Sequence, residues 1–166
     1  EAPTVFVPGD LQESRIEMDD LRMTWKRLNT ATDDTVGIIA LGNPHFALEE
    51  FPQLIKLIES RTKQPEVDIV ITLGRFVYQQ AKEVGYLETL ERFGAKFIND
   101  TCWCMLQEPV VPCRRCNIMT NSAKYAHYGP GITRKKFHFG SMASCVEAAC
   151  IGKRRSDDAS PKWLYG

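Results

Sequence analysis

The chain has 166 residues, the usual length of one domain, and can bury a core without a metal ion or a disulfide to support it. Its 21 basic and 21 acidic residues balance, so its charge gives no reason to expect a nucleic-acid partner or an anionic membrane. No apolar run approaches the roughly 18 residues of a membrane-spanning helix, so we expect no membrane partner either.

Short apolar runs alternate with helical patterns along the chain. The apolar runs predict strands at residues 4–8, 36–42, 67–74, 95–100, 117–120 and 136–140. Apolar residues at helical spacing predict helices over residues 10–29, 46–60, 75–94 and 141–152. Between the last two strands, Ser122 can cap a shorter helix that we expect the sequence Gly129-Pro130-Gly131 to end.

This alternation predicts the fold class. Strands that are almost wholly apolar and are separated by helices indicate a parallel sheet covered on both faces. We therefore predict an α/β domain over residues 1–152, with three α/β/α layers and a mostly parallel sheet. The polar tail, residues 153–166, is predicted to be a linker, at least until Trp163.

Polar segments follow the predicted strands, and in a parallel sheet such segments meet at one edge, where ligands bind. His45 is a candidate general acid, base or ligand, although a lone histidine is more often structural. Arg75 is a candidate carboxylate clamp or an ordinary first-turn residue. Asn43 either binds substrate or serves in the turn.

The stretch "TNSAKYAHYGPG" (120–131) suits an anion. A helix capped by Ser122 offers unpaired N–H groups, and Lys124 adds a positive charge that would attract a carboxylate or a phosphate. An equally good interpretation is a capped loop with an exposed lysine and two packing tyrosines, Tyr125 and Tyr128.

The six cysteines do not form a disulfide scaffold in a chain of this size, which favours a reducing, cytoplasmic setting. Cys102, Cys104, Cys113 and Cys116 have a spacing loosely compatible with a structural zinc site, and iron–sulfur clusters take the same ligands. Cys145 lies in an amphipathic helical pattern, where a free cysteine is usually part of the core.

Four separated motifs together closely resemble the catalytic, large-subunit region of the aconitase X family. They are "ALGNPHFALEE", "DTCWCMLQEPVVP", "TNSAKYAHYGPG" and "FGSMASCVEAA", and the match runs from about Val36 to Ala149. The resemblance implies an aconitase-like domain of a dehydratase that acts on cis-3-hydroxy-L-proline or on mevalonate 5-phosphate. Such enzymes hold their substrate on an iron–sulfur cluster, and the open iron acts as a Lewis acid on the leaving hydroxyl.

The resemblance also implies roles for individual residues. Cys102 matches a cluster-ligand position, Cys145 is the second candidate, and Cys104 is a local alternative to them. Ser122, Lys124 and Tyr125 would line the site for the substrate carboxylate or phosphate, and His45 would lie near the cluster. Our candidate catalytic residues are therefore His45 and Lys124, and our candidate substrate-binding residues are Asn43, Arg75, Ser122, Lys124 and Tyr125.

The chain also departs from the family pattern. Asn43 stands where archaeal-type members commonly carry a cysteine, which favours the hydroxyproline branch. The family region is more than twice as long as this chain, which also begins without a methionine or a signal-like segment, so we expect a piece of a longer enzyme. The missing partners would be an N-terminal catalytic part and a small swivelling domain or subunit, whose serine is taken to act as the base. Without them, we expect the chain to be inactive. The zinc-binding structural module stays the alternative from another class.

Overall fold

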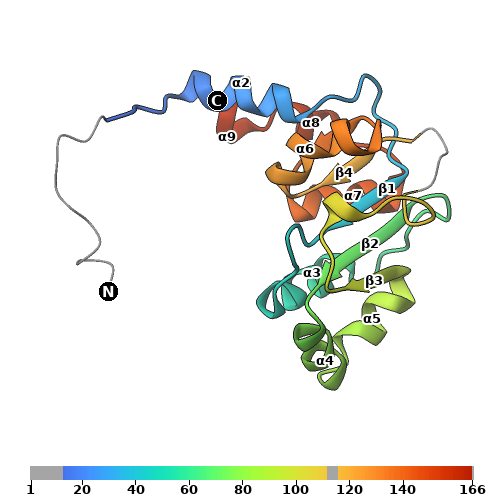
Figure 1. The fold of residues 1–166 in the computed structure, drawn as a ribbon. Helices are drawn as coiled ribbons and strands as arrows, with labels where there is room; N and C mark the ends of the chain where they lie inside the picture. Colours follow the sequence, from blue (N-terminus) through green and yellow to red (C-terminus); the bar gives the residue numbers. More distant parts are fainter. Residues whose placement is uncertain (1–12, 112–115, 166) are drawn as a thin grey trace, which may run out of the picture.

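The computed structural model describes residues 13–111 and 116–165, and its centre is a parallel five-stranded sheet (Figure 1). Every strand pair is parallel, and the strand order is β3-β2-β1-β4-β5. The strands are β1 (Ile38–Leu41), β2 (Asp68–Leu73), β3 (Ala95–Asn99), β4 (Ile118–Thr120) and β5 (Phe137–Phe139). Each lies inside a predicted apolar run, and the sixth predicted strand, at residues 4–8, falls outside the described residues.

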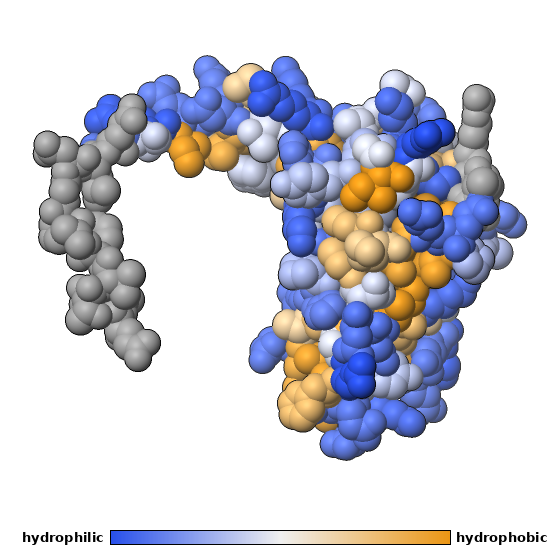
Figure 2. Space-filling model, in the orientation of Figure 1, coloured by the Kyte–Doolittle hydropathy of each residue, from blue (hydrophilic) through white to orange (hydrophobic). Residues whose placement is uncertain are grey.

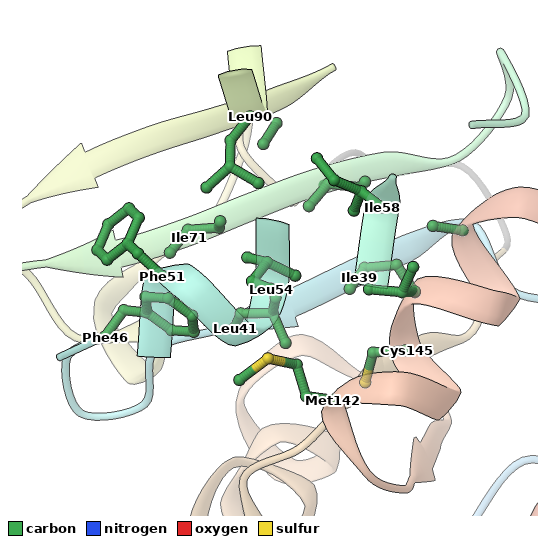
Figure 3. Close-up of a cluster of buried hydrophobic side chains, with 14 of the residues drawn as sticks. Ile39, Leu41, Phe46, Phe51, Leu54, Ile58, Ile71, Leu90, Met142 and Cys145 are labelled. Carbon is green, nitrogen blue, oxygen red and sulfur yellow. The ribbon is translucent and has the colours of Figure 1, made fainter. Parts of the chain in front are cut away.

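Two apolar layers cover the sheet, which confirms the predicted three-layer α/β/α class. Alternate strand residues point to opposite faces, so Ile39 and Leu41 belong to one core while Ile38 and Ala40 belong to the other. The first core lies under α3 (Phe51–Ile58), α5 (Tyr86–Phe93) and α7 (Met142–Ile151), as Figure 3 shows. The second lies under α6 (Ala123–Thr133) and the segment 103–111, which begins with the 3₁₀ turn η2 (Trp103–Met105).

The order of the strands places a topological switch point between β1 and β4. The connections that leave β1 and β2 run through the helices of the first face, which include α4 (Arg75–Glu83) beside α5. The connections that leave β3 and β4 run through η2 and α6 on the second face. Because the chain leaves β1 and β4 toward opposite faces, the carboxyl ends of these two strands are the place where a sheet of this topology usually binds ligands.

Two predicted helices are divided. The helical pattern at 46–60 begins with a 3₁₀ turn, η1 (Leu48–Glu50), before α3, in keeping with Pro52 in the first turn of that helix. The pattern at 75–94 forms α4 and α5, with Gly85 in the left-handed conformation between them.

Helix α6 does not end where the sequence predicted. It runs through Gly129, Pro130 and Gly131 to Thr133, and the backbone N–H of Arg134, its C-cap, donates to the Pro130 carbonyl at 3.1 Å. Gly129 serves for packing instead, because a Cβ atom there would lie 2.2 Å from the Phe137 ring. Tight packing of α6 against β5 therefore outweighs the helix-breaking tendency of the sequence.

The polar tail, predicted as a linker, is folded where it is described. It forms α8 (Ser156–Ala159) and α9 (Lys162–Tyr165), which lie beside α2 (Met18–Leu28) in Figure 1. The Trp25 indole of α2 donates to the Ala159 carbonyl at 3.2 Å and packs edge-on against Trp163. In Figure 2 polar side chains cover much of the visible face, with apolar ones gathered on the body of the domain and along the underside of the α2 arm. No helix in the described part of the chain is long and apolar enough to cross a bilayer.

His138 on β5 is a buried histidine whose ring nitrogens have no hydrogen-bond partner among the described residues. Burial, together with the positive charge of Arg154, lowers its pKa to about 4, against the opposing carboxylates of Asp34 and Asp33. The folded protein therefore holds the ring neutral at a pH where the unfolded chain, with a pKa of about 6.5, binds a proton.

This difference predicts how stability depends on pH. Because only the unfolded state takes up the proton, the free energy of unfolding should fall by on the order of 2–3 kcal/mol as the pH drops from about 6.5 to about 4. Above about pH 7 the contribution of His138 should be constant. Urea unfolding at a series of pH values should show this slope in the native protein and in His127→Gln, which changes an exposed histidine. His138→Leu should have a smaller slope, and an equal slope in all three proteins would contradict the assignment to His138.

Candidate functional site

The loops at the carboxyl ends of β1, β2, β3 and β4 meet at one edge of the sheet. The Ser122 hydroxyl, after β4, donates to the Asn43 carbonyl, after β1, at 3.1 Å. The Cys102 thiol, after β3, donates to Asn43 Oδ1 over 3.9 Å. His45 Nε2 lies 3.2 Å from the Thr101 carbonyl. Residues from three of the four separate motifs are thus in contact, as expected for the ends of parallel strands.

The loop after β1 is held in place from several sides. Gly42 has φ +78°, and a Cβ atom there would lie 2.1 Å from the Thr72 carbonyl oxygen. The buried Thr72 hydroxyl donates to the Gly42 carbonyl, and the Trp103 indole donates to the Leu41 carbonyl at 2.9 Å. The Phe46 N–H donates to the Thr72 carbonyl at 2.8 Å. These bonds fix the backbone that carries Asn43.

Cys104 and Lys124 belong to the same group. Burial raises the pKa of the Cys104 thiol, and the neighbouring Cys102 raises it further, while Asn43 and the positive charge of Lys124 lower it. The two thiols are half-buried and Lys124 is exposed. The edge therefore presents two soft metal ligands beside a fixed amide and a cation.

Two buried polar atoms at this edge have no hydrogen-bond partner in the described chain: Asn43 Nδ2 and the Tyr125 hydroxyl. Tyr125 is fully buried, with its ring 5.1 Å from that of Trp103 and 5.0 Å from that of Phe137. Burial raises its pKa, and the nearby Cys104 and Cys102 add to this effect. Tyr125 is thus part of the core behind the site, and its hydroxyl and the Asn43 amide are donors that lack acceptors.

Ser122 and Arg75 already have partners. The Ser122 hydroxyl donates to Asn43 and accepts the Tyr125 N–H at 3.2 Å, which makes it the N-cap of α6, as the sequence predicted. Asp100 accepts the Arg75 backbone N–H at 2.9 Å and pairs with the Arg75 guanidinium at 2.5 Å. The backbone hydrogen bond, together with the guanidinium, lowers the pKa of the Asp100 carboxyl. The Arg75 side chain is still 83% exposed, so its remaining N–H groups face solvent.

His45 has a defined tautomer. A carbonyl oxygen can only accept, so the nitrogen near Thr101 must carry the proton and donate it. The neutral ring then keeps Nδ1 as an acceptor, near Gly74 at the end of β2. His45 is exposed on this edge, so its Nδ1 is open to a ligand.

The structure does not bring Cys145 to this group. Cys145 is fully buried on the other face of the sheet, where it packs beside Met142 and below Ile39 (Figure 3). Burial among apolar side chains raises the pKa of its thiol, which disfavours the thiolate that binds metal. This placement matches the core role that its helical pattern also allowed.

The zinc module built from four cysteines is also disfavoured. Cys116 packs against Gly37, just before β1, whereas Cys102 contacts Asn43 just beyond the other end of that strand. A zinc ion needs its sulfur ligands about 2.3 Å away and cannot bridge the two edges. Cys113 lies outside the described residues. Within residues 13–111 and 116–165, no three His, Cys, Asp or Glu side chains are grouped to hold a metal ion.

The sequence interpretation missed several residues that build this edge. Thr72 and Trp103 hold the loop after β1, and Asp100 orients Arg75. Asp100 was open to prediction, since it directly follows β3. Thr72 was not, because a single threonine in a buried strand gives no signal of its hydrogen-bond partners.

A protein-family model described as the aconitase X third domain matches residues 36–151. The chain belongs to the aconitase X family. This match includes all five strands and every residue of the edge described above.

Curated relatives carry two kinds of name. Proteins named cis-3-hydroxy-L-proline dehydratase are 49% identical over 83% of this chain in Hypocrea jecorina and 48% identical over 90% in Pseudomonas aeruginosa. A phosphomevalonate dehydratase large subunit from Methanocaldococcus jannaschii is 26% identical over 85% of the chain. The chain covers only 23%, 26% and 34% of these relatives, in the same order.

One solved structure supports the fold. The chain superimposes on the crystal structure of Thermococcus kodakaraensis aconitase X (holo-form) with a TM-score of 0.70 and 24% sequence identity, over 86% of this chain and 36% of that one. At this identity the likeness bears on the arrangement of the sheet and helices, which it confirms as that of an aconitase X domain.

The geometry of the β1 loop predicts a strong effect for one glycine substitution. Gly42→Ala should destabilise the domain by more than about 3 kcal/mol, because an unfavourable positive φ is combined with a clash against backbone. Gly85→Ala is the matched control, since Gly85 also has positive φ but nothing lies within 4 Å of an added Cβ. This substitution should lower the free energy of unfolding by only about 1–2 kcal/mol. Urea unfolding measures the stability of both variants. An equal loss of stability in the two would show that the clash with the Thr72 carbonyl does not add to the effect of Gly42→Ala.

Proposed function

We propose that this chain is the third-domain part of an aconitase X-type dehydratase, a hydro-lyase that eliminates water from a small hydroxy acid. The observation that carries the proposal is the meeting of Asn43, His45, Cys102, Cys104 and Lys124 at one edge of the sheet. This edge offers soft metal ligands, a cation for an anionic substrate and a histidine that can move a proton.

The first candidate substrate is cis-3-hydroxy-L-proline. Support comes from identities of 48–49% to relatives with that name, against 26–31% to phosphomevalonate dehydratase large subunits. Asn43, in place of the cysteine common in archaeal-type members, points the same way. Mevalonate 5-phosphate is the alternative substrate, since Lys124 at a helix N-terminus suits a phosphate as well as a carboxylate.

The edge fits part of an iron–sulfur site. Such clusters take thiolate ligands, commonly three or four from the protein. Cys102 and Cys104 are the two candidates in this chain, with Cys102 first, and the two donors without acceptors lie beside them. The other ligands would come from parts of the enzyme outside this chain. When bound, the cluster would supply a Lewis-acidic iron that polarises the leaving hydroxyl of the substrate.

The residues of this chain would bind and orient the substrate. Lys124, in the first turn of α6, would hold the substrate carboxylate with help from the positive end of the helix dipole. The free N–H groups of Arg75 would serve a second oxygen of the substrate. His45 Nδ1, with its tautomer set by Thr101, would accept or donate a proton near the leaving group.

The proposed partners are the other parts of the enzyme. An N-terminal catalytic part would complete the cluster ligands, and a small swivelling domain or subunit would cover the edge and bring the base. Free thiols at the edge are consistent with a reducing cytoplasm, where we place the enzyme.

The isolated chain should be inactive, because only one wall of the proposed site belongs to it. Purified chain incubated with cis-3-hydroxy-L-proline or mevalonate 5-phosphate should give no product above the rate without protein. The complete enzyme, assayed in parallel, is the positive control. Robust turnover by the isolated chain would contradict the proposal that the site is shared.

Removing one thiol should remove the cluster from the complete enzyme. After anaerobic reconstitution with iron and sulfide, Cys102→Ala should lose the visible absorption and most of the iron of the native enzyme, and activity should fall on the order of 100-fold or more. Cys150→Ala is the matched control, because Cys150 is a half-buried thiol on α7, away from the edge. Stoichiometric zinc lost on changing Cys113 and Cys116 together, with no iron, would favour the zinc module.

A further inference from the structure

Asn43 has a side-chain amide of which only one end is used. Its Oδ1 accepts the S–H of Cys102 over 3.9 Å, and the same amide favours the ionised form of Cys104. Its Nδ2 is buried and makes no hydrogen bond with any described residue. The amide thus lies beside both thiols with two N–H donors unused.

Such a donor needs an acceptor. A buried polar group without a hydrogen-bond partner lowers the stability of the folded protein by about 1–3 kcal/mol, and such groups are rare in native structures. A protonated thiol is a weak acceptor, whereas a thiolate is an anion and accepts a charge-assisted hydrogen bond. Metal binding removes the thiol protons, so strong acceptors would arise beside Asn43 when a cluster binds.

The backbone of Asn43 cannot turn away to satisfy the amide elsewhere. Its carbonyl accepts from Ser122 at 3.1 Å, and the preceding Gly42 is held against Thr72. The side chain can still rotate about its Cβ–Cγ bond, which exchanges Oδ1 and Nδ2. This rotation gives up the long S–H···O contact with Cys102, which is lost in any case when the thiol loses its proton.

We propose that Asn43 is a positioning residue that donates an N–H···S hydrogen bond to the thiolate of Cys102 or Cys104 in the cluster-bound enzyme. Such a bond stabilises the added negative charge of the reduced cluster and so raises its reduction potential. This inference rests on the proposed function, because it requires a cluster at this edge. It gives Asn43 the role of a hydrogen-bond donor to a cluster ligand. The sequence had suggested instead that Asn43 contacts the substrate or serves in a turn.

The first experiment measures the reduction potential of the complete, reconstituted enzyme. Asn43→Leu removes the donor with little change in side-chain volume. At a fixed potential, the ratio of reduced to oxidised cluster should fall about tenfold, which means that the reduction potential falls by about 59 mV for one electron. Asn43→Asp, which also adds a negative charge, should shift the potential further in the same direction. Gln107→Leu is the control, because it removes an exposed amide on the segment that follows Cys104.

The second experiment uses the native sequence and so does not depend on how a variant folds. Enzyme labelled with ¹⁵N in its asparagine side-chain amides should show a ¹⁵N coupling to the reduced cluster in pulsed electron paramagnetic resonance. A labelled enzyme without this coupling would overturn the inference, as would an Asn43→Leu enzyme that binds the cluster at an unchanged potential. Either result would leave the proposed function intact, whereas failure of the native enzyme to bind any cluster would refute the proposed function itself.

Discussion

The arrangement of the candidate site depends on how the end of β1 is held. The Thr72 hydroxyl and the Trp103 indole donate to carbonyls at this end, and Gly42 turns the chain at positive φ with no room for a side chain. The residues that follow, Asn43 to Phe46, are therefore fixed against β2 and the segment after β3. Because donors from β2 and from the segment after β3 hold its backbone, the loop presents its side chains at a defined edge of the sheet.

The residues of the site fall into a buried group that supports it and a more exposed group that carries its reactive atoms. Trp103 and Tyr125 fill the core under the edge, and Ser122 joins the start of α6 to the β1 loop. Cys102, Cys104 and Lys124 remain at the surface or half-buried, where they can meet another domain. Reactive groups that face outward from a fixed backbone agree with the proposal that other parts of the enzyme complete this site, because a preorganised surface lets such parts bind in one geometry.

The strands and the class of fold were open to prediction because buried parallel strands are apolar on both faces and carry a strong local signal. The edge that holds Asn43, His45 and Cys102 was also predictable, because the carboxyl ends of parallel strands converge. The burial of individual side chains could not be predicted from the sequence. Tyr125 and Cys145 looked like site residues from their motifs, yet both lie in apolar cores on opposite faces of the sheet. The side of a helix that faces the sheet depends on packing, which a motif does not encode.

The sequence by itself determined the alternation of strands and helices, the family resemblance and the set of residues that gather at one edge. It did so because these features depend on local periodicity and on the order of motifs. The tertiary structure decided that α6 continues through Pro130, that Cys116 lies at the edge opposite Cys102, and that Asn43 keeps two unused donors beside two thiols. Each of these results arises from packing between separate elements of the fold, such as Gly129 of α6 against Phe137 of β5 or Cys116 against Gly37, and no single segment of sequence specifies them.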